Sequence, residues 1–525
     1  MPTNFVFLVE DWFHRGYTRE IKLADWNLNK FVKNARGDFC ADIKRTYDNS
    51  VIGQKGRQSP VINAKGRFYD PYEENIKSAL PLEMFVVQRH QSYVFRIVGM
   101  AAVNSYRISI DDHKLKIIAI DGSDIEAVEA ESIIIQSGER FDVEIYTDAP
   151  IGNYWIRLED MAVQDNNGES IPMTTGFGIL RYDGATEEDP VSKREECSET
   201  KPCRVINCLF GKFPPITHLY CTPISELQAK HNGIQKSRVP VVSIEDDMQE
   251  FFLNFHYSVM KNNPETAVST INGIRMSLPT IPPLMTDIFP MKLCPASSSE
   301  FASECTHMLK LNMGKVIQFV LINFESTGFG RPHPIHMHGH KFYVLKIGFP
   351  HYDPESGQMT RMNEDIVCES TTCNSARWAN SSWQFGNVPG MNLQNPPLKD
   401  TIIVPWGGYA VIRITADNPG YWYMHCHIEL HNIDGMAIIL QEGEQTDIPE
   451  RPTGMPVCGD MPNILQQKVK NTVALLQQTG GNELTVKSDM TPSSVVGITI
   501  MGVIVSLSLV LNIVGVLIVL RRRMS

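Results

Sequence analysis

The chain has 525 residues, enough for two or three domains that each bury a core of their own. Its formal net charge is -11 at pH 7, and basic residues cluster only in the last five positions, which argues against a nucleic-acid partner. Runs of β-branched and other apolar residues bounded by Gly, Pro, Asn and Asp recur along the chain, as at 316–322. This pattern predicts an all-β fold built from sandwich domains.

Residues 1–184 are predicted to form the first of these domains. The apolar run at 5–9 is followed by Glu10 and Asp11, so it is too short for the core of a signal peptide. It is interpreted instead as the first strand of the domain. No export signal is visible in this chain.

Residues 185–240 are polar and dense in cysteine, and they are interpreted as a connector between domains. Besides Cys426, the chain contains ten cysteines: Cys40, Cys197, Cys203, Cys208, Cys221, Cys294, Cys305, Cys368, Cys373 and Cys458. An even number in a β-rich chain predicts disulfides and an oxidising compartment, with buried free thiols as the alternative. The sequon Asn380-Ser381-Ser382 is compatible with a glycosylated extracellular loop.

A second domain is predicted over residues 241–446, and it contains two histidine-rich stretches. The first runs from His333 to His340, and the second runs from His425 to Met436 after an aromatic segment typical of the end of a β-strand. Successive side chains of a strand point to opposite faces. Alternation and proximity therefore divide the candidate ligands into two sets: His333, Cys426, His431 and Met436 in the first, and His336, His338, His425 and His427 in the second.

The two sets differ in their chemistry. Two imidazoles, a thiolate and a weak axial thioether suit a copper ion that carries single electrons, whereas an all-imidazole set suits copper that handles O2. Cys426 is bonded on both sides to members of the second set, so the backbone offers a short path for electrons between them. A lone His-x-His pair would fit two half-exposed histidines or a zinc site equally well. His340 lies beyond the ligand positions and is expected to make a structural hydrogen bond.

These stretches resemble the third and fourth copper motifs of the multicopper oxidases, the family of laccases, ascorbate oxidase and ferroxidases. The resemblance implies two cupredoxin-like Greek-key β-sandwich domains and copper as the cofactor. Carried over by position, it implies a type 1 copper held by His333, Cys426, His431 and Met436, a type 2 copper held by His336, and a type 3 pair held by His338, His425 and His427.

The family also contributes two further histidine pairs from a preceding domain. The first 300 residues of this chain contain no His-x-His or His-Trp-His sequence. We therefore expect a complete type 1 site and a trinuclear type 2 and type 3 site of which only half is supplied by this chain. The chain is interpreted as N-terminally truncated relative to the family.

An internal repeat indicates that the first domain is a cupredoxin-like domain without copper ligands. Residues 106–114 align with 333–341, and residues 152–159 align with 420–427. In this register the ligand positions are occupied in the first domain by Tyr106, Ser109, Asp111, Arg157, Leu158 and Glu159. A slip of one position would still leave no set of copper ligands.

The C-terminal part of the chain is predicted to attach the protein to a membrane. Residues 447–494 are interpreted as a stalk, 495–520 as a transmembrane helix and 521–525 as a short basic tail. The uncharged 26-residue run would span about 39 Å as a helix, enough for a bilayer core. The arginines that follow favour a cytoplasmic C-terminus and extracellular copper domains. There are two alternatives. The helix could be a tail anchor that leaves the rest of the protein in the cytosol, or it could be a buried helix of a soluble protein.

The resemblance implies a laccase-like oxidase that couples one-electron oxidation of phenols or aromatic amines to the four-electron reduction of O2 to water. Ferrous iron and ascorbate are alternative reductants. Electrons are expected to enter through an exposed edge of His333 or His431 and to pass through His425, Cys426 and His427, the catalytic candidates. The alternative is a copper-binding or electron-transfer membrane protein, an inactive isoform with only the type 1 site complete. The sequence does not specify the oligomeric state.

Overall fold

The computed structural model describes residues 3–13, 43–54, 58–68, 80–165, 167–230, 239–240, 242, 248–280, 282–285, 293–294, 301–325, 330–370, 372–386, 388–450 and 452. Over these residues the chain consists of β-strands, short 3-10 turns and the five-residue helix α2 (Glu429–Ile433). The predicted all-β fold is therefore confirmed for the described part of the chain.

The first half of the chain forms two large sheets. Their strand orders are β4-β1-β6-β11-β8-β9 and β16-β15-β10-β7-β12-β14-β5. The strands are β1 (Thr3–Phe13), β4 (Gln58–Ile62), β5 (Met84–Val87), β6 (Ser92–Gly99), β7 (Tyr106–Ile110), β8 (Leu115–Ile120), β9 (Ser123–Ala130), β10 (Ser132–Ile135), β11 (Arg140–Tyr146), β12 (Asn153–Glu159), β14 (Thr175–Tyr182), β15 (Cys203–Ile206) and β16 (Leu219–Thr222). A small third sheet joins β13 (Gln164–Asp165), β2 (Ile43–Arg45) and β3 (Val51–Gln54).

Alternation along the strands creates the faces that pack together. In β11, Phe141, Val143 and Ile145 are fully buried and are separated by partly exposed polar residues. They share one apolar core with Ile108 of β7 and Ile156 of β12, which belong to the opposite sheet. The two sheets therefore pack face to face as a sandwich.

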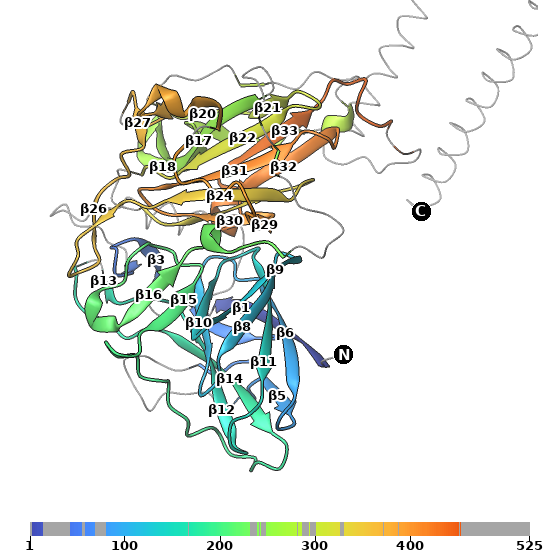
Figure 1. Cartoon of the computed structure of the whole chain (residues 1–525). Helices are drawn as coiled ribbons and strands as arrows, with labels where there is room; N and C mark the ends of the chain where they lie inside the picture. The colour runs from blue at the N-terminus through green and yellow to red at the C-terminus, as the bar shows by residue number, and fades with distance from the viewer. Residues whose placement is uncertain are drawn as a thin grey trace, which may run out of the picture. The chain divides into compact units, whose positions relative to one another are not determined.

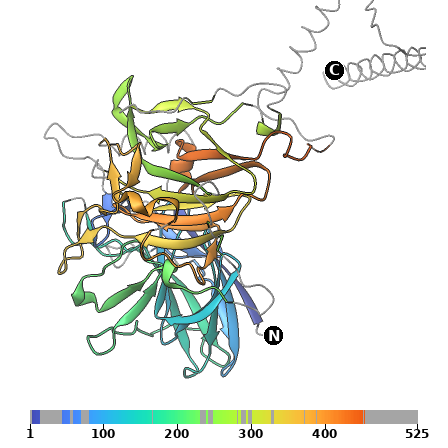
Figure 2. The same cartoon turned by 45° about the horizontal axis from the view of Figure 1, so that its top comes forward.

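The second half of the chain also forms two large sheets, drawn from light green through yellow to orange in Figure 1 and Figure 2. Their orders are β20-β19-β18-β17-β22-β31-β24-β29 and β21-β33-β32-β23-β30. The strands are β17 (Met248–Met260), β18 (Asn263–Ile271), β19 (Ile274–Met276), β20 (Ser303–Cys305), β21 (Met308–Leu311), β22 (Val316–Ile322), β23 (His333–Met337), β24 (Phe342–Gly348), β29 (Leu398–Lys399), β30 (Thr401–Val404), β31 (Tyr409–Thr415), β32 (Gly420–Cys426) and β33 (Ala437–Glu442).

The apolar run at 316–322 is the central strand β22, and all of its residues are buried. Two two-stranded ribbons complete this half of the chain: β25 (His351–Tyr352) with β26 (Met359–Arg361), and β27 (Ile366–Cys368) with β28 (Ala376–Trp378).

The strand register matches the internal repeat found in the sequence. In the first half, antiparallel pairing of β7 with β12 places Ser109 opposite Arg157. In the second half, antiparallel pairing of β23 with β32 places His336 opposite His425. The aligned residues therefore occupy equivalent positions on equivalent strand pairs, without the slip of one position that the alignment alone had allowed.

The described cysteines also behave as expected. Four disulfides join Cys197 to Cys203, Cys208 to Cys221, Cys294 to Cys305, and Cys368 to Cys373, and Cys426 is a free buried thiol. Cys40 and Cys458 lie outside the described residues.

The predicted transmembrane helix (495–520), the basic tail and nearly all of the predicted stalk also lie outside the described residues. Among the residues that are described, no helix is both long enough and apolar enough to cross a bilayer.

A buried ion cluster connects the two halves. Lys399 Nζ lies 3.0 Å from Asp121 Oδ2 and 3.3 Å from Glu139 Oε1, and all three side chains are fully buried. Beside it, Arg140 makes two hydrogen bonds of 2.5 Å with the carboxylate of Asp400. The first half of the chain thus fixes the position of the segment between β29 and β30.

We expect Lys399→Met to destabilise the protein by about 3–5 kcal/mol, because it leaves two carboxylates buried without their cation. Urea unfolding of the full chain at pH 7 measures this loss. The control Lys341→Met removes an exposed lysine that also reaches across to the first half, through hydrogen bonds to Gly122 and Ser123. Its cost should stay within about 0.5 kcal/mol, and equal losses in the two variants would contradict a special role of the buried cluster.

Candidate metal centre

The site is built on the pairing of β23 with β32. Ile335 lies opposite Cys426, His336 opposite His425, and Met337 opposite Met424. A further backbone hydrogen bond of 2.7 Å, from His427 N to the Pro334 carbonyl, extends the contact beyond the end of β32. Because the strands are pleated, neighbouring side chains of this ribbon point to opposite faces.

On the buried face, three predicted ligands come together. Cys426 Sγ lies 3.5 Å from His333 Nδ1 and 3.5 Å from His431 Nδ1, and the two histidine nitrogens are 3.1 Å apart. An ion bonded to nitrogen at about 2.0 Å and to sulfur at about 2.3 Å would hold three such donors roughly 3.5 Å apart in one plane. The spacing and the soft sulfur donor therefore fit a metal of the copper type.

Met436 lies in the same buried region. Its side chain is fully buried, its carbonyl accepts a hydrogen bond of 3.0 Å from Cys426 N, and its own N–H donates to the His431 carbonyl at 2.9 Å. The turn after α2 thus connects the backbone of Met436 directly to two residues of the cluster.

The thiol of Cys426 is poised for a cation. Burial raises its pKa to about 12, so the thiolate does not form at neutral pH without a positive partner. A bound metal ion would supply that charge, and Cys426 would then be its thiolate ligand.

The other face of the ribbon carries the four remaining imidazoles. The ring centroid of His336 lies 5.0 Å from that of His338 and 5.7 Å from those of His425 and His427. The centroid of His425 lies 5.6 Å from those of His338 and His427. The structure therefore brings together all four members of the second predicted set.

Burial lowers the pKa of three of these imidazoles, those of His338, His425 and His427, and so favours their neutral form. Burial, and then repulsion from the neighbouring imidazoles, lowers the pKa of His425 to about 3, and burial also lowers the pKa of His427. His336 Nδ1 lies 2.9 Å from the carbonyl oxygen of Asp400. This contact fixes the proton on Nδ1 and leaves the lone pair of Nε2 for a metal.

The first half of the chain contributes to this face. Ser137 Oγ forms a hydrogen bond of 2.9 Å with His427 Nδ1. The next residue, Gly138, has a φ of +84°, and a Cβ at this position would come within 2.4 Å of the His427 ring. Glycine is therefore required here both for the backbone conformation and for the space that the imidazole occupies.

The surroundings of the cluster formed by His333, Cys426 and His431 differ from the sequence prediction. An exposed imidazole edge was expected, but His333 and His431 have 1% and 0% of their surface exposed. Tyr257 of β17 packs edge-on against His431, and its hydroxyl forms a hydrogen bond of 2.8 Å with His431 Nε2. The expectation of an exposed edge was wrong, because β17 covers the ring.

His340 confirms the prediction of a structural hydrogen bond. Its Nε2 lies 2.6 Å from the buried Glu442 Oε2. Sequence reasoning missed Tyr257, Ser137 and Asp400. Nothing in their local sequence marks them, because they reach the histidines only through the tertiary fold.

Two family models, both described as multicopper oxidase, match residues 3–185 and 276–446. The chain belongs to the multicopper oxidase family. Members of this family are copper oxidoreductases that use O2, so the assignment implies copper as the metal.

Curated relatives from plants and fungi agree with this assignment. Laccase-25 of Oryza sativa subsp. japonica is 24% identical over 79% of this chain and 70% of its own length. L-ascorbate oxidase of Cucumis sativus is 26% identical over 83% and 66%, and Laccase-1 of Botryotinia fuckeliana is 28% identical over 68% and 50%. The chain thus spans only 50% to 70% of the length of these three relatives.

Two solved structures share the fold. Fet3p, a multicopper oxidase that functions in iron import, has a TM-score of 0.55 and 18% identity over 85% of this chain and 66% of its own. The laccase from Botrytis aclada has a TM-score of 0.54 and 20% identity over 93% and 70%.

We expect Tyr257→Phe to weaken copper binding at the Cys426 site by roughly 10- to 100-fold, because His431 loses the hydrogen bond that orients it. The measurement is a copper titration of the full chain against a competing chelator, followed by visible absorption. Tyr154→Phe is the matched control, since the hydroxyl of Tyr154 bonds only the Pro150 carbonyl among the contacts observed. Unchanged affinity in Tyr257→Phe would contradict an orienting role.

Proposed function

We propose that this chain forms the electron-accepting part of a laccase-type copper oxidase. It takes single electrons from a phenolic or aromatic reductant and passes them to a site where O2 is reduced to water. One observation carries the proposal. The donors of His333, Cys426 and His431 gather on one face of the β23–β32 ribbon, and four imidazoles gather on the opposite face. Copper bound to the two faces would supply one-electron chemistry on one side and O2 chemistry on the other.

The proposed roles follow the placement of the side chains. His333, Cys426, His431 and Met436 would hold the type 1 copper, His336 the type 2 copper, and His338, His425 and His427 the type 3 pair. The backbone from His425 to His427 would carry electrons between the faces. Burial of the thiolate cluster excludes water, and the carbonyl of Asp400 and the hydroxyl of Ser137 orient His336 and His427.

Because His333 and His431 are buried, we propose that the electron crosses a protein layer that includes Tyr257. Phenols are the first candidates for the reductant, since several relatives are named laccases. Ferrous iron and ascorbate remain alternatives, since one structural neighbour functions in iron import and other relatives are named ascorbate oxidases.

The second candidate function is copper binding with electron transfer but without O2 reduction. It is favoured by the number of imidazoles on this face. Only four gather there among the described residues, and one of them, His338, is exposed. In this case the type 1 site would be complete and the trinuclear site only half supplied by this chain.

Two measurements on the copper-loaded full chain test these functions. The proposal predicts an absorption band near roughly 600 nm from the thiolate copper, together with O2 uptake when a phenol is added. Cys426→Ser should abolish both signals, whereas His338→Gln should keep the band and lose the uptake. His307→Gln, which changes a buried histidine outside both clusters, is the control and should keep both.

A band without O2 uptake in the unaltered chain would reject the oxidase and support the electron-transfer protein. The absence of the band from copper-loaded protein would reject both candidates.

We further propose that the domains follow the boundaries 1–184, 185–240, 241–446 and 447–494, and that 495–520 anchors the protein with its copper domains outside the cell. The four disulfides support an oxidising compartment. The full chain should then stay with membranes after alkaline carbonate washing, and a chain ending at residue 494 should be released. Release of both forms would rule out the anchor.

A further inference from the structure

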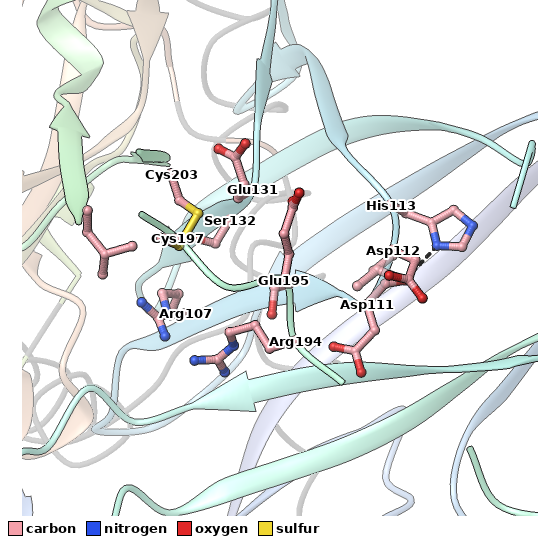
Figure 3. A pocket seen from close by; sticks show the side chains of 13 residues that line it. Arg107, Asp111, Asp112, His113, Glu131, Ser132, Arg194, Glu195, Cys197 and Cys203 are labelled. Atoms are coloured by element: carbon pink, nitrogen blue, oxygen red, sulfur yellow. Dashed lines mark hydrogen bonds between the residues drawn. A yellow bond between two sulfur atoms is a disulfide. The ribbon is translucent and has the colours of Figure 1, made fainter. Parts of the chain in front are cut away.

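A second polar site lies in the first half of the chain, far from the copper ligands in sequence. It is a small pocket of about 40 Å³, partly open to solvent, between β7, the start of β10 and the segment that contains the Cys197–Cys203 disulfide. Figure 3 shows the guanidinium groups of Arg107 and Arg194 on one side of this pocket and the carboxylates of Glu131 and Glu195 on the other.

The pocket borders the strand pair that corresponds to the copper-binding ribbon. Ser109 and Arg157 pair across β7 and β12 at the positions that His336 and His425 hold in the second half. The first half therefore has the same backbone arrangement, with charged groups and a hydroxyl at the positions where the second half has imidazoles.

These charged groups form a linked network. Arg157 makes two hydrogen bonds, of 2.8 and 2.7 Å, with the carboxylate of Asp111. Arg107 donates to Glu159 Oε2 at 3.0 and 2.7 Å, and Arg194 donates to the other oxygen of Glu159. Three guanidinium groups thus share two carboxylates, so these five groups together carry one positive charge, while Asp112, Glu131 and Glu195 also line the pocket.

Two donors of residues that line the pocket lack an acceptor. The Ser109 hydroxyl and Arg194 Nε are both buried, and neither has a hydrogen-bond partner within the described structure. Ser109 is only 8% exposed. Buried polar groups are seldom left without a partner, so these two donors indicate that an acceptor belongs in the pocket.

The opposite side of the pocket limits which acceptor can bind. Glu131 forms an ion pair with Lys114, and Glu195 with Lys201 and Lys114. The charges of these carboxylates are balanced by the lysines, but the carboxylates would still repel a dianion placed beside them. Burial, and then the guanidinium groups of Arg107 and Arg157, lower the pKa of Arg194 to about 9, so it is still charged at pH 7.

We propose that this pocket binds a small organic carboxylate, whose oxygens accept hydrogen bonds from Arg194 and Ser109 and whose single negative charge balances the guanidinium cluster. This site is separate from the copper ligands and does not depend on the proposed oxidase activity.

Isothermal titration calorimetry of the full chain at pH 7, in a buffer free of carboxylates, tests the proposal with acetate as the probe. We expect saturable binding at one site. Arg194→Gln should weaken it by at least about tenfold, because a charged hydrogen bond is lost. Ser109→Ala should also weaken it, and this variant removes a hydroxyl that supports no other observed contact.

The matched control is Arg204→Gln. It removes the same charge from β15, from an arginine that lies over Tyr220 and does not line the pocket. Its acetate affinity should equal that of the unaltered protein. Absence of saturable binding, an equal loss in Arg204→Gln, or tighter binding of sulfate than of acetate would overturn the proposal.

Discussion

Antiparallel pairing of β23 with β32 is the constraint on which the proposed copper site depends. Cys426 is paired with Ile335, and its neighbours in the chain are the two histidines of the opposite face. The pleat therefore places sulfur and imidazole back to back, one residue apart. A shift of one residue in this register would turn Cys426 away from His333 and His431, and both ligand sets would be lost together.

The second half of the chain does not complete this arrangement by itself. Ser137, Gly138 and Arg140 come from the loop before β11 and the start of that strand, and they act on His427 and Asp400. Asp400 in turn orients His336 through its carbonyl. The buried ion cluster around Lys399 lies at the same junction, so the positions of the imidazoles depend on how the two halves pack.

The comparison of the two halves separates backbone geometry from chemistry. Both contain the same strand pair in the same register. In one, four imidazoles gather on one face, where they could share metal ions. In the other, arginines and carboxylates neutralise one another through ion pairs. The fold places four side chains on one face of this strand pair in each half. The identity of those side chains decides whether the face suits a metal or an anion.

The sequence by itself determined the strands, the division of the histidines into two faces and the equivalence of the repeats. These features depend on alternation between neighbouring residues, which is local. Only the tertiary structure decided that Tyr257 covers His431, that Ser137 reaches His427 and that Lys399 is buried between two carboxylates. These contacts join residues up to 290 positions apart. They follow from the packing of whole sheets, which no local pattern specifies.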